Sequence, residues 1–247
     1  MVTAAPQDQW RLLDVQGHDT RLTQLAHRRR TLPEHADVER LAAVLRQSDG
    51  RLVAARTAVG DLSRELAKAE ADVDQVRQRA IRNQARLDAG TGTAKDLQAL
   101  QHELEALAQR QSVLEEIELG VMERLEAAEA EVARIVADTE LAGRDLAEAT
   151  DRRDGALAGL AEEEAAERRA RADAAAGLPE DLLALYEKVR ENTGGIGAAR
   201  LFRRRCEGCR LELNTTDLGR IRTAAEDAVV RCEECSRILI RTPDSGL

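Results

Sequence analysis

Aromatic residues are nearly absent from this chain of 247 residues, whose only three are Trp10, Tyr186 and Phe202. Proline occurs four times and methionine twice, whereas 34% of the residues are Asp, Glu, Lys or Arg. So few aromatic and β-branched side chains exclude a broad, compact core. Alanine, leucine, glutamate and arginine dominate instead, and that bias is typical of long helices and coiled coils.

Long apolar stretches are missing as well. No run approaches the roughly 20 residues that a helix needs to span a bilayer. Residues 1–8 lack the basic start and apolar core of a signal peptide. We therefore expect a cytoplasmic protein with no membrane association, whose thiols lie in a reducing environment where disulfides are rare.

All four cysteines lie in two Cys-x-x-Cys motifs separated by twenty-two residues. Each motif offers two sulfurs on one tight turn, and two such motifs at this spacing are typical of a four-thiolate zinc site. Four thiolates close the tetrahedral shell, so the metal would be structural rather than catalytic. The motifs predict one structural Zn²⁺ bound by Cys206, Cys209, Cys232 and Cys235. Disulfides, iron or an empty site are the alternatives.

Apolar residues recur at alternating steps of three and four over residues 38–87 and again over 97–160. This heptad pattern predicts two coiled-coil helices. Because a short glycine-containing turn joins them, they must run antiparallel, with Val38 opposite Leu146. Glu118 interrupts the second pattern, and we expect Ile117 to replace it at the seam.

The first helix is predicted over residues 7–30, with Leu12, Val15 and Leu25 among the apolar residues on one side. Pro33 then predicts either a break or a kink, since proline removes an interior helix hydrogen bond. The second helix of the hairpin is long enough to cover this first helix as well.

The fold predicted is mainly α, a long antiparallel coiled-coil helical hairpin with a small C-terminal β-rich zinc ribbon. The hairpin covers 1–176, with its tip near 88–94 and the break or kink at 31–33. A short connecting helix and glycine linker follow over 177–195, and the C4 zinc ribbon occupies 196–247. A ribbon of this size with one aromatic cannot bury enough apolar area to fold unaided, so we expect it to be disordered without zinc.

Three segments together carry a family resemblance: Lys95–Glu103 just past the glycine turn, Leu178–Tyr186, and the two cysteine motifs. The chain resembles the bacterial coiled-coil hairpin proteins with a C-terminal C4-type zinc ribbon, and its arginine-rich composition is typical of an actinobacterial member. The resemblance implies a non-enzymatic adaptor, with members proposed to bind RNA, DNA or protein and some linked to flagellar or secretion systems. Glu234 and Ser236 replace the proline and glycine that are usual in the second motif.

No catalytic constellation accompanies these motifs. The four histidines are scattered along predicted helices without a cysteine or acid at ligand spacing, and we expect them to be solvated. Residues 194–197, Gly-Gly-Ile-Gly, lack the Gly-Lys-Ser/Thr ending of a phosphate loop. The sequence therefore predicts that the protein is not an enzyme. The histidines are His18, His27, His35 and His102.

Nucleic-acid binding is the first partner hypothesis. The net charge is −9, and residues 196–247 carry ten Arg against eight Asp or Glu, so charge alone does not favour it. The arginines nevertheless cluster around the first cysteine motif, where a strand would place Arg203 and Arg205 on one face. Pairing with nearby glutamates is the structural alternative. The candidate residues are Arg200, Arg203, Arg204, Arg205, Arg210 and Arg222.

A protein partner at the hairpin tip is the second hypothesis. RNA-polymerase secondary-channel factors also join a hairpin to a metal module and carry acidic tip residues, so an RNA-polymerase-associated regulator is a further alternative. The chain could bridge partners by its tip and ribbon as a purely structural scaffold, as a monomer or a dimer. The candidate tip residues are Asp88, Gly90, Gly92, Lys95 and Asp96.

Overall fold

The structure, a computed structural model, describes residues 2–247. It divides into two compact units, one formed by Ala36–Thr150 and the other by the segments up to His35 and from Asp151 onward. Within the described residues, no helix is both long and apolar enough to cross a membrane. The elements in chain order are α1 (Pro6–Arg30), α2 (Pro33–Asp88), α3 (Ala94–Ala175), α4 (Glu180–Asn192), β1 (Ala198–Phe202), β2 (Arg205–Cys206), α5 (Thr215–Thr223), β3 (Val230–Arg231), β4 (Ile238–Ile240) and the short 3-10 helix η1 (Pro243–Ser245).

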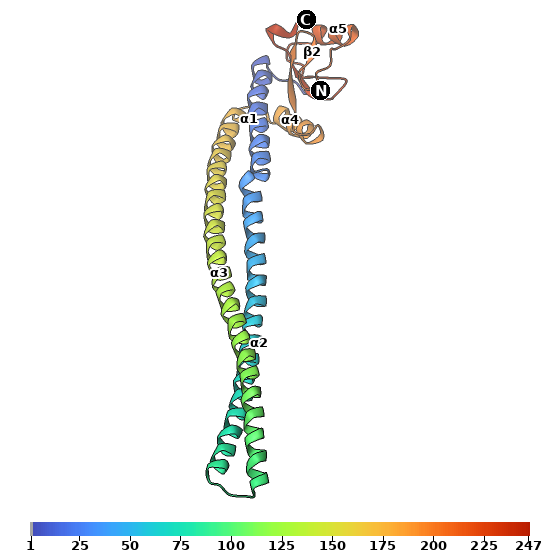
Figure 1. Cartoon of the computed structure of the whole chain (residues 1–247). Helices are drawn as coiled ribbons and strands as arrows, with labels where there is room; N and C mark the ends of the chain where they lie inside the picture. Colours follow the sequence, from blue (N-terminus) through green and yellow to red (C-terminus); the bar gives the residue numbers. More distant parts are fainter. Residues whose placement is uncertain (1) are drawn as a thin grey trace. The chain divides into compact units, whose positions relative to one another are not determined.

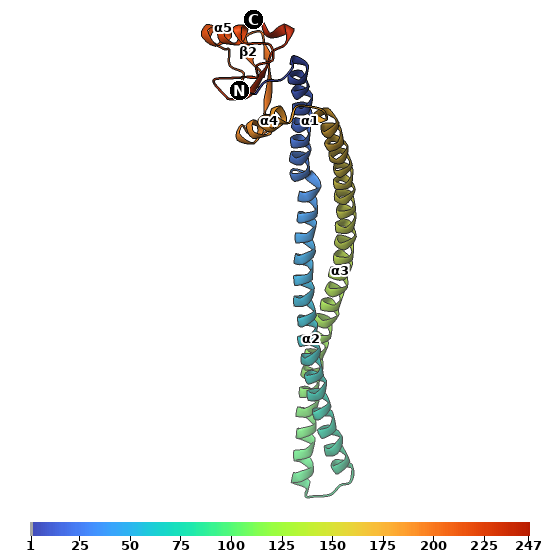
Figure 2. The ribbon, with the colours of Figure 1, turned by 180° about the vertical axis from the view of Figure 1, so that it is seen from behind.

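The first unit is an antiparallel hairpin of α2 and α3, which lie side by side in Figures 1 and 2. Its antiparallel register is visible in ion pairs between the helices, such as Arg51 Nη2 to Glu131 Oε1 at 3.4 Å and Arg79 to Glu103 nearer the tip. The buried residues of this unit all occupy the predicted heptad positions, which confirms the seam. They are Ser48, Ala69, Val73, Asn83, Leu100, Leu114, Val121, Ile135, Ala142 and Ala149.

One seam prediction is wrong. Ile117 is 51% exposed, whereas Glu118 remains half-buried at the heptad position. A helix cannot exchange one seam position for its neighbour without rotating by about 100°, and the well-buried Leu114 and Val121 on either side prevent that rotation. Glu118 can occupy this position because a glutamate can cover apolar surface with its aliphatic part while its carboxylate stays in water.

The tip between the two helices is a turn of left-handed glycines. Gly90 has φ of +61° and Gly92 has φ of +134°, backbone conformations that residues with a Cβ rarely adopt. Thr93 then caps α3, because the Asp96 carboxylate accepts hydrogen bonds from the Thr93 backbone N–H at 3.0 Å and hydroxyl at 2.7 Å. The Thr93 hydroxyl in turn accepts from the Asp96 N–H at 3.3 Å. The reciprocal pair fixes the start of α3 directly after the turn.

Pro33 breaks the helix rather than kinking it. α1 ends at Arg30, Thr31 and Leu32 lie outside both helices, and α2 starts at Pro33. Proline suits the first position of a helix because the missing N–H would have no intrahelical partner there. Helix α1 is therefore a packing element separate from α2, and it belongs to the second unit.

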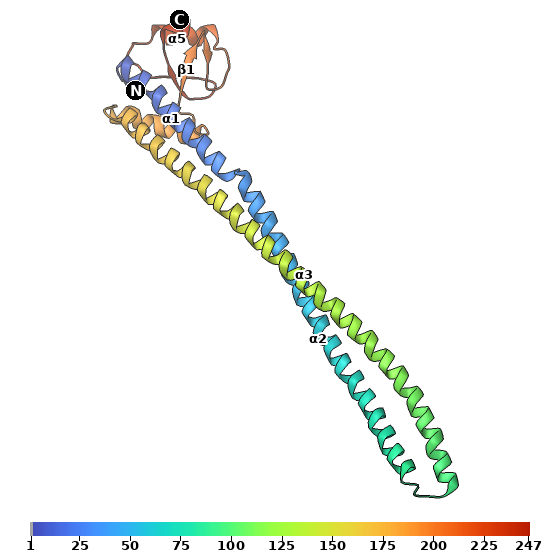
Figure 3. The same ribbon diagram turned by 60° about the vertical axis from the view of Figure 1, so that its left-hand side comes forward.

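In the second unit α1 lies along the C-terminal part of α3 (Figure 3). Arg11 donates a hydrogen bond to the Ala174 carbonyl at 3.1 Å, and His18 Nδ1 lies 2.6 Å from Glu167 Oε1. His18 was expected to be solvated without an acid partner, and this contact corrects that expectation. Leu12, Val15 and Leu25 are buried as predicted.

The C-terminal sheet has the strand order β2-β1-β4-β3. β1 pairs parallel with β4, and the register sets Ala198 beside Ile238 and Arg200 beside Ile240. One sheet face, including Ala198, Ile238 and Ile240, packs against α1 and α4. The opposite face, including Leu201 and Leu239, packs against α5 and the cysteines. The sheet thus takes part in two cores, of which only one involves the cysteine motifs.

Gly197, which directly precedes β1, lies close to α4. A Cβ at this position would lie 2.8 Å from both the Tyr186 ring and the Tyr186 carbonyl oxygen. We expect Gly197→Ala to lower the free energy of unfolding by about 1–3 kcal/mol, since backbone must move to admit the methyl group. Urea denaturation measures the loss.

Gly219→Ala is the matched control, because nothing lies within 4 Å of a Cβ there and the residue is inside α5. Alanine favours a helix over glycine by up to about 1 kcal/mol, so this variant should be no less stable than the parent. Equal destabilisation by both substitutions would contradict the close approach.

Candidate functional site

The four cysteine side chains converge between the β1–β2 and β3–β4 hairpins. Their sulfur atoms all lie within 4.8 Å of one another, with 3.9 Å from Cys206 Sγ to Cys235 Sγ and 3.9 Å from Cys209 Sγ to Cys232 Sγ. Tetrahedral coordination with zinc–sulfur bonds of ~2.3 Å separates sulfurs by about 3.8 Å. A disulfide would need about 2.05 Å. The site suits one structural Zn²⁺.

Both cysteine motifs have the same backbone turn. The Arg210 N–H donates to the Cys206 carbonyl at 2.7 Å, and the Ser236 N–H donates to the Cys232 carbonyl at 2.8 Å. Arg210 and Ser236 both have φ of +61°, the left-handed conformation that glycine usually supplies. Ser236 thus reproduces the geometry of the glycine it replaces, at a modest cost in strain.

The thiols differ in their surroundings. Burial raises the pKa of the Cys206 thiol to about 11, and burial also raises the pKa of Cys232. At Cys235 burial acts in the same direction, but hydrogen bonds led by that from the Arg237 backbone leave the pKa below its ordinary value. Metal binding therefore has to release protons from the two most buried thiols, which makes zinc affinity depend on pH.

The structure places the arginines differently from the sequence prediction. β1 ends at Phe202, and Arg203 and Arg204 form a two-residue hairpin turn with φ of +46° and +68°. Arg203 and Arg205 therefore do not alternate along one strand face, and that prediction is wrong. The Arg203 guanidinium instead lies 5.2 Å from the centroid of the Phe202 ring, so it covers the one aromatic side chain of residues 196–247.

Four other arginines of the ribbon have structural roles. Arg220 pairs with Glu233, and Arg231 donates to the Ser236 carbonyl. Arg237 donates to the carbonyls of Thr193 and Ile196. Arg241 binds five carbonyls of residues 221–228 and so holds the loop that precedes β3.

The six candidate arginines differ from those four. Over residues 2–247, none of their guanidinium groups has a carboxylate within 4.0 Å or donates a side-chain hydrogen bond. The predicted alternative, pairing with nearby glutamates, thus does not account for them. They are Arg200, Arg203, Arg204, Arg205, Arg210 and Arg222, and we call them the arginine surface.

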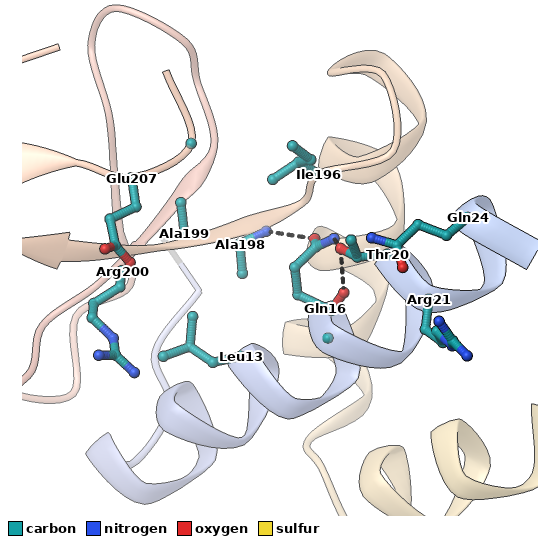
Figure 4. A pocket seen from close by; sticks show the side chains of 12 residues that line it. Leu13, Gln16, Thr20, Arg21, Gln24, Ile196, Ala198, Ala199, Arg200 and Glu207 are labelled. Atoms are coloured by element: carbon teal, nitrogen blue, oxygen red, sulfur yellow. Dashed lines mark hydrogen bonds between the residues drawn. The ribbon is translucent and has the colours of Figure 1, made fainter. Parts of the chain in front are cut away.

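An open pocket of about 560 Å³ lies between α1 and β1 (Figure 4). Gln16 occupies its centre, accepting from the Gly197 N–H at 2.7 Å and donating to the Thr20 hydroxyl at 3.1 Å. Arg200 and Glu207 lie at one end, and Arg21 and Gln24 at the other. The Gln16 amide at the centre of the pocket is already hydrogen-bonded, and these bonds hold α1 against β1.

A buried polar cluster in the same unit escaped the sequence prediction. The Asp19 carboxylate accepts from Arg171 at 2.7 and 3.1 Å and from the Tyr186 hydroxyl at 2.6 Å. Burial tends to raise the pKa of Asp19, but these hydrogen bonds lower it overall. The lone tyrosine of a polar chain was the one available signal, because tyrosine brings a hydroxyl that needs a partner when buried.

The predicted tip residues lie in the hairpin unit and are all exposed. The Asp96 carboxylate is engaged by Thr93, and the Asp88 carboxylate accepts from Gln84 Nε2 at 2.8 Å. Gly90 and Gly92 shape the turn itself. Four of the five candidates thus have a local structural role, and their part in binding stays a prediction.

The chain matches two known domain families and several known proteins. Residues 15–194 match the CT398-like coiled coil hairpin domain, and residues 205–239 match the C4-type zinc ribbon domain. A protein of Mycobacterium tuberculosis is 38% identical over 230 residues, covering 93% of this chain and 94% of that protein. A Mycobacterium smegmatis structure, 37% identical, superposes with a TM-score of 0.85 over 98% of this chain and all of its own.

A more distant structure shares the fold. CT398 from Chlamydia trachomatis is 16% identical and has a TM-score of 0.70, covering 96% of this chain and 98% of its own. The relatives with higher identity are mycobacterial, in agreement with the predicted actinobacterial character. The chain therefore belongs to the family of proteins that carry a CT398-like coiled coil hairpin domain, here followed by a C4-type zinc ribbon.

Proposed function

We propose that this protein is a non-enzymatic adaptor whose zinc ribbon binds RNA or DNA through phosphate groups. The observation that carries the proposal is the arginine surface, six guanidinium groups without a carboxylate partner in the described part of a chain whose net charge is −9. Acidic groups outnumber basic ones overall, so the chain has enough carboxylates to pair with these six arginines. Because none of them does so in the described residues, binding of an external anion is favoured. Arginine binds phosphate through two parallel N–H donors.

The chemistry of the surface indicates backbone recognition. Phosphate contacts position a protein on a nucleic acid without reading its sequence. The Phe202 ring is covered by Arg203, so stacking on bases has little to build on. We therefore expect binding with low sequence preference and a strong dependence on salt.

Zinc has a supporting role in this proposal. We assign Cys206, Cys209, Cys232 and Cys235 as its ligands, because their sulfurs match tetrahedral spacing. When bound, the metal holds the two cysteine turns together, and the arginine-bearing β1–β2 turn with them. Paired cysteine motifs of this kind are typical of a reducing compartment, and we place the protein in the cytoplasm.

The test compares oligonucleotide binding by the parent and by a variant with Arg203, Arg204 and Arg205 all changed to alanine. Fluorescence anisotropy at several salt concentrations gives the slope of log affinity against log salt. Three lost phosphate contacts should weaken binding and reduce the slope for a single strand by about two. Arg220→Ala is the matched control, because Arg220 already pairs with Glu233 and should leave binding nearly unchanged.

The second candidate is a protein scaffold that bridges partners by its hairpin tip and ribbon. Its support is the exposure of every residue from Asp88 to Asp96. Parent binding that is weak and that the triple variant leaves unchanged would favour this scaffold over the nucleic-acid adaptor. The regulator of RNA polymerase has less support, since the acidic groups at the tip are engaged by Thr93 and Gln84.

A further inference from the structure

Two residues of the arginine surface face the same small hollow. Arg204 from the β1–β2 turn and Arg222 from α5 line a cavity of about 300 Å³, together with Thr215, Gly219 and Gly246. The other four candidates do not line this hollow. Two arginine residues that line one hollow are a more specific feature than arginines that share no hollow with one another.

Arg204 is held rigidly at this site. Its N–H donates to the Ser245 carbonyl at 2.8 Å, and its carbonyl accepts from the Leu213 N–H at 2.9 Å. Its φ of +68° belongs to a turn position where asparagine or glycine is usual, so an arginine costs conformational energy there. Strain of this kind concentrates at functional sites. Here the strained backbone fixes the position from which the Arg204 side chain extends.

Arg222 is positioned with similar rigidity. Leu218 and Ile221 anchor α5 in the ribbon core, and Asn214 caps the helix by accepting from the Asp217 N–H at 2.8 Å. Thr215, Gly219 and Arg222 recur at helical spacing and so share one face of α5. Nothing lies within 4 Å of a Cβ built at Gly219, which also lines the hollow, so the glycine adds no side chain that would fill it.

We propose that the Arg204–Arg222 hollow binds the terminal phosphate monoester of a nucleic-acid strand. This inference rests on the proposed function and names a subsite within it. A terminal monoester has three free oxygens and a charge of about −1.5 to −2 at pH 7, which suits two guanidinium groups. An internal phosphodiester has two free oxygens and continues as chain on both sides. A concave hollow therefore receives the end of a strand, while the remaining arginines contact internal phosphates.

The experiment measures the affinity of the zinc-loaded full chain for one short oligouridine in two forms, with a terminal phosphate and with a terminal hydroxyl. We expect the phosphorylated form to bind about tenfold more tightly, the effect of one additional charge-assisted contact. Arg222→Ala should remove this preference, and it should lower the affinity for the hydroxyl form no more than the loss of any other single arginine of the arginine surface does. Arg210→Ala is the matched control, since Arg210 lies outside the hollow; it should weaken both forms alike and preserve the preference.

A second variant tests the hollow without removing a charge. Gly219→Leu adds a side chain to the lining of the hollow, at a helical position that leucine favours. It should abolish the preference for the terminal phosphate while helicity and zinc content stay at the parent level.

The possible failures are distinguishable. Equal affinity of the parent for the two oligouridines would overturn the subsite and leave the proposed function standing. No measurable binding of either form would overturn both. If a phosphoserine peptide binds and oligouridine does not, the hollow would be a binding site for a protein partner, which would contradict the proposal.

Discussion

Cys206→Ser is expected to abolish zinc binding and to unfold β2 and α5 of the ribbon while leaving helices α1 to α4 folded. Structural zinc supplies about 10–16 kcal/mol of folding free energy in isolated zinc-finger peptides. The core beside the cysteines is small, with Leu201, Leu213 and Leu218 among its buried residues. Without the metal, β2 and α5 should therefore lose their protected amides.

The loss of structure should not extend to strands β1 and β4. Ala198, Ile238 and Ile240 pack on α1 and α4, in a core that contains no metal ligand among its described residues. From this packing we expect partial rather than complete disorder of the ribbon without zinc, which narrows the sequence-based prediction. β1 and β4 should retain slow exchange because their packing against α1 and α4 does not depend on the metal.

Plasma mass spectrometry measures the zinc content, and amide hydrogen exchange measures the loss of structure in the ribbon. The parent should hold one zinc per chain and the variant close to none. Leu211→Ser is the matched control, since Leu211 is 50% exposed and adjacent to the first motif. Full zinc occupancy in Cys206→Ser, or unchanged exchange in α5 after zinc loss, would contradict the assignment.

Asp19→Ala should cost about 3 kcal/mol of unfolding free energy, because it removes one member of a buried charged cluster. The Asp19 side chain is only 5% exposed and binds Arg171 through both carboxylate oxygens. In the variant, Arg171 should still pair with Glu187. The Tyr186 hydroxyl should still donate a hydrogen bond to Gln16 Oε1, which lies at 3.2 Å in the parent. These remaining partners hold the cost near the lower end of the range for broken buried pairs.

Urea denaturation followed by circular dichroism measures the change, and Asp14→Ala is the control. Asp14 lies on the same helix but is exposed, so its removal should change stability by less than about 0.5 kcal/mol. A similar loss in both variants would show that the effect comes from α1 itself rather than from the cluster.

The Asp19 contribution should also depend on pH. The hydrogen bonds place the pKa of the folded carboxyl below its ordinary value of 3.8. A lowered pKa stabilises the fold above the unfolded value, and this stabilisation is lost as the pH falls through the folded value. The stability difference between parent and Asp19→Ala should therefore be constant near neutral pH and shrink below pH 3.8.

Local signals in the sequence were sufficient for the helices and the metal site. The heptad steps identify every buried position of the hairpin unit, because a helix face follows directly from residue spacing. Gly90 and Gly92 locate the turn for the same reason, since their left-handed angles exclude most other residues there. The spacing of the cysteines within each motif predicts two convergent turns, because ligand geometry leaves few alternatives.

Tertiary structure alone decided how these parts share their cores. No periodicity in residues 7–30 shows that Leu12 and Val15 pack with Ile238 and Ile240, more than two hundred residues away, because such partners are chosen by shape and burial and not by local propensity. The same holds for Asp19 beside Tyr186 and for Arg204 beside Arg222. Sequence could name the arginines, but only the left-handed turn and the packing of α5 bring two of them to one hollow.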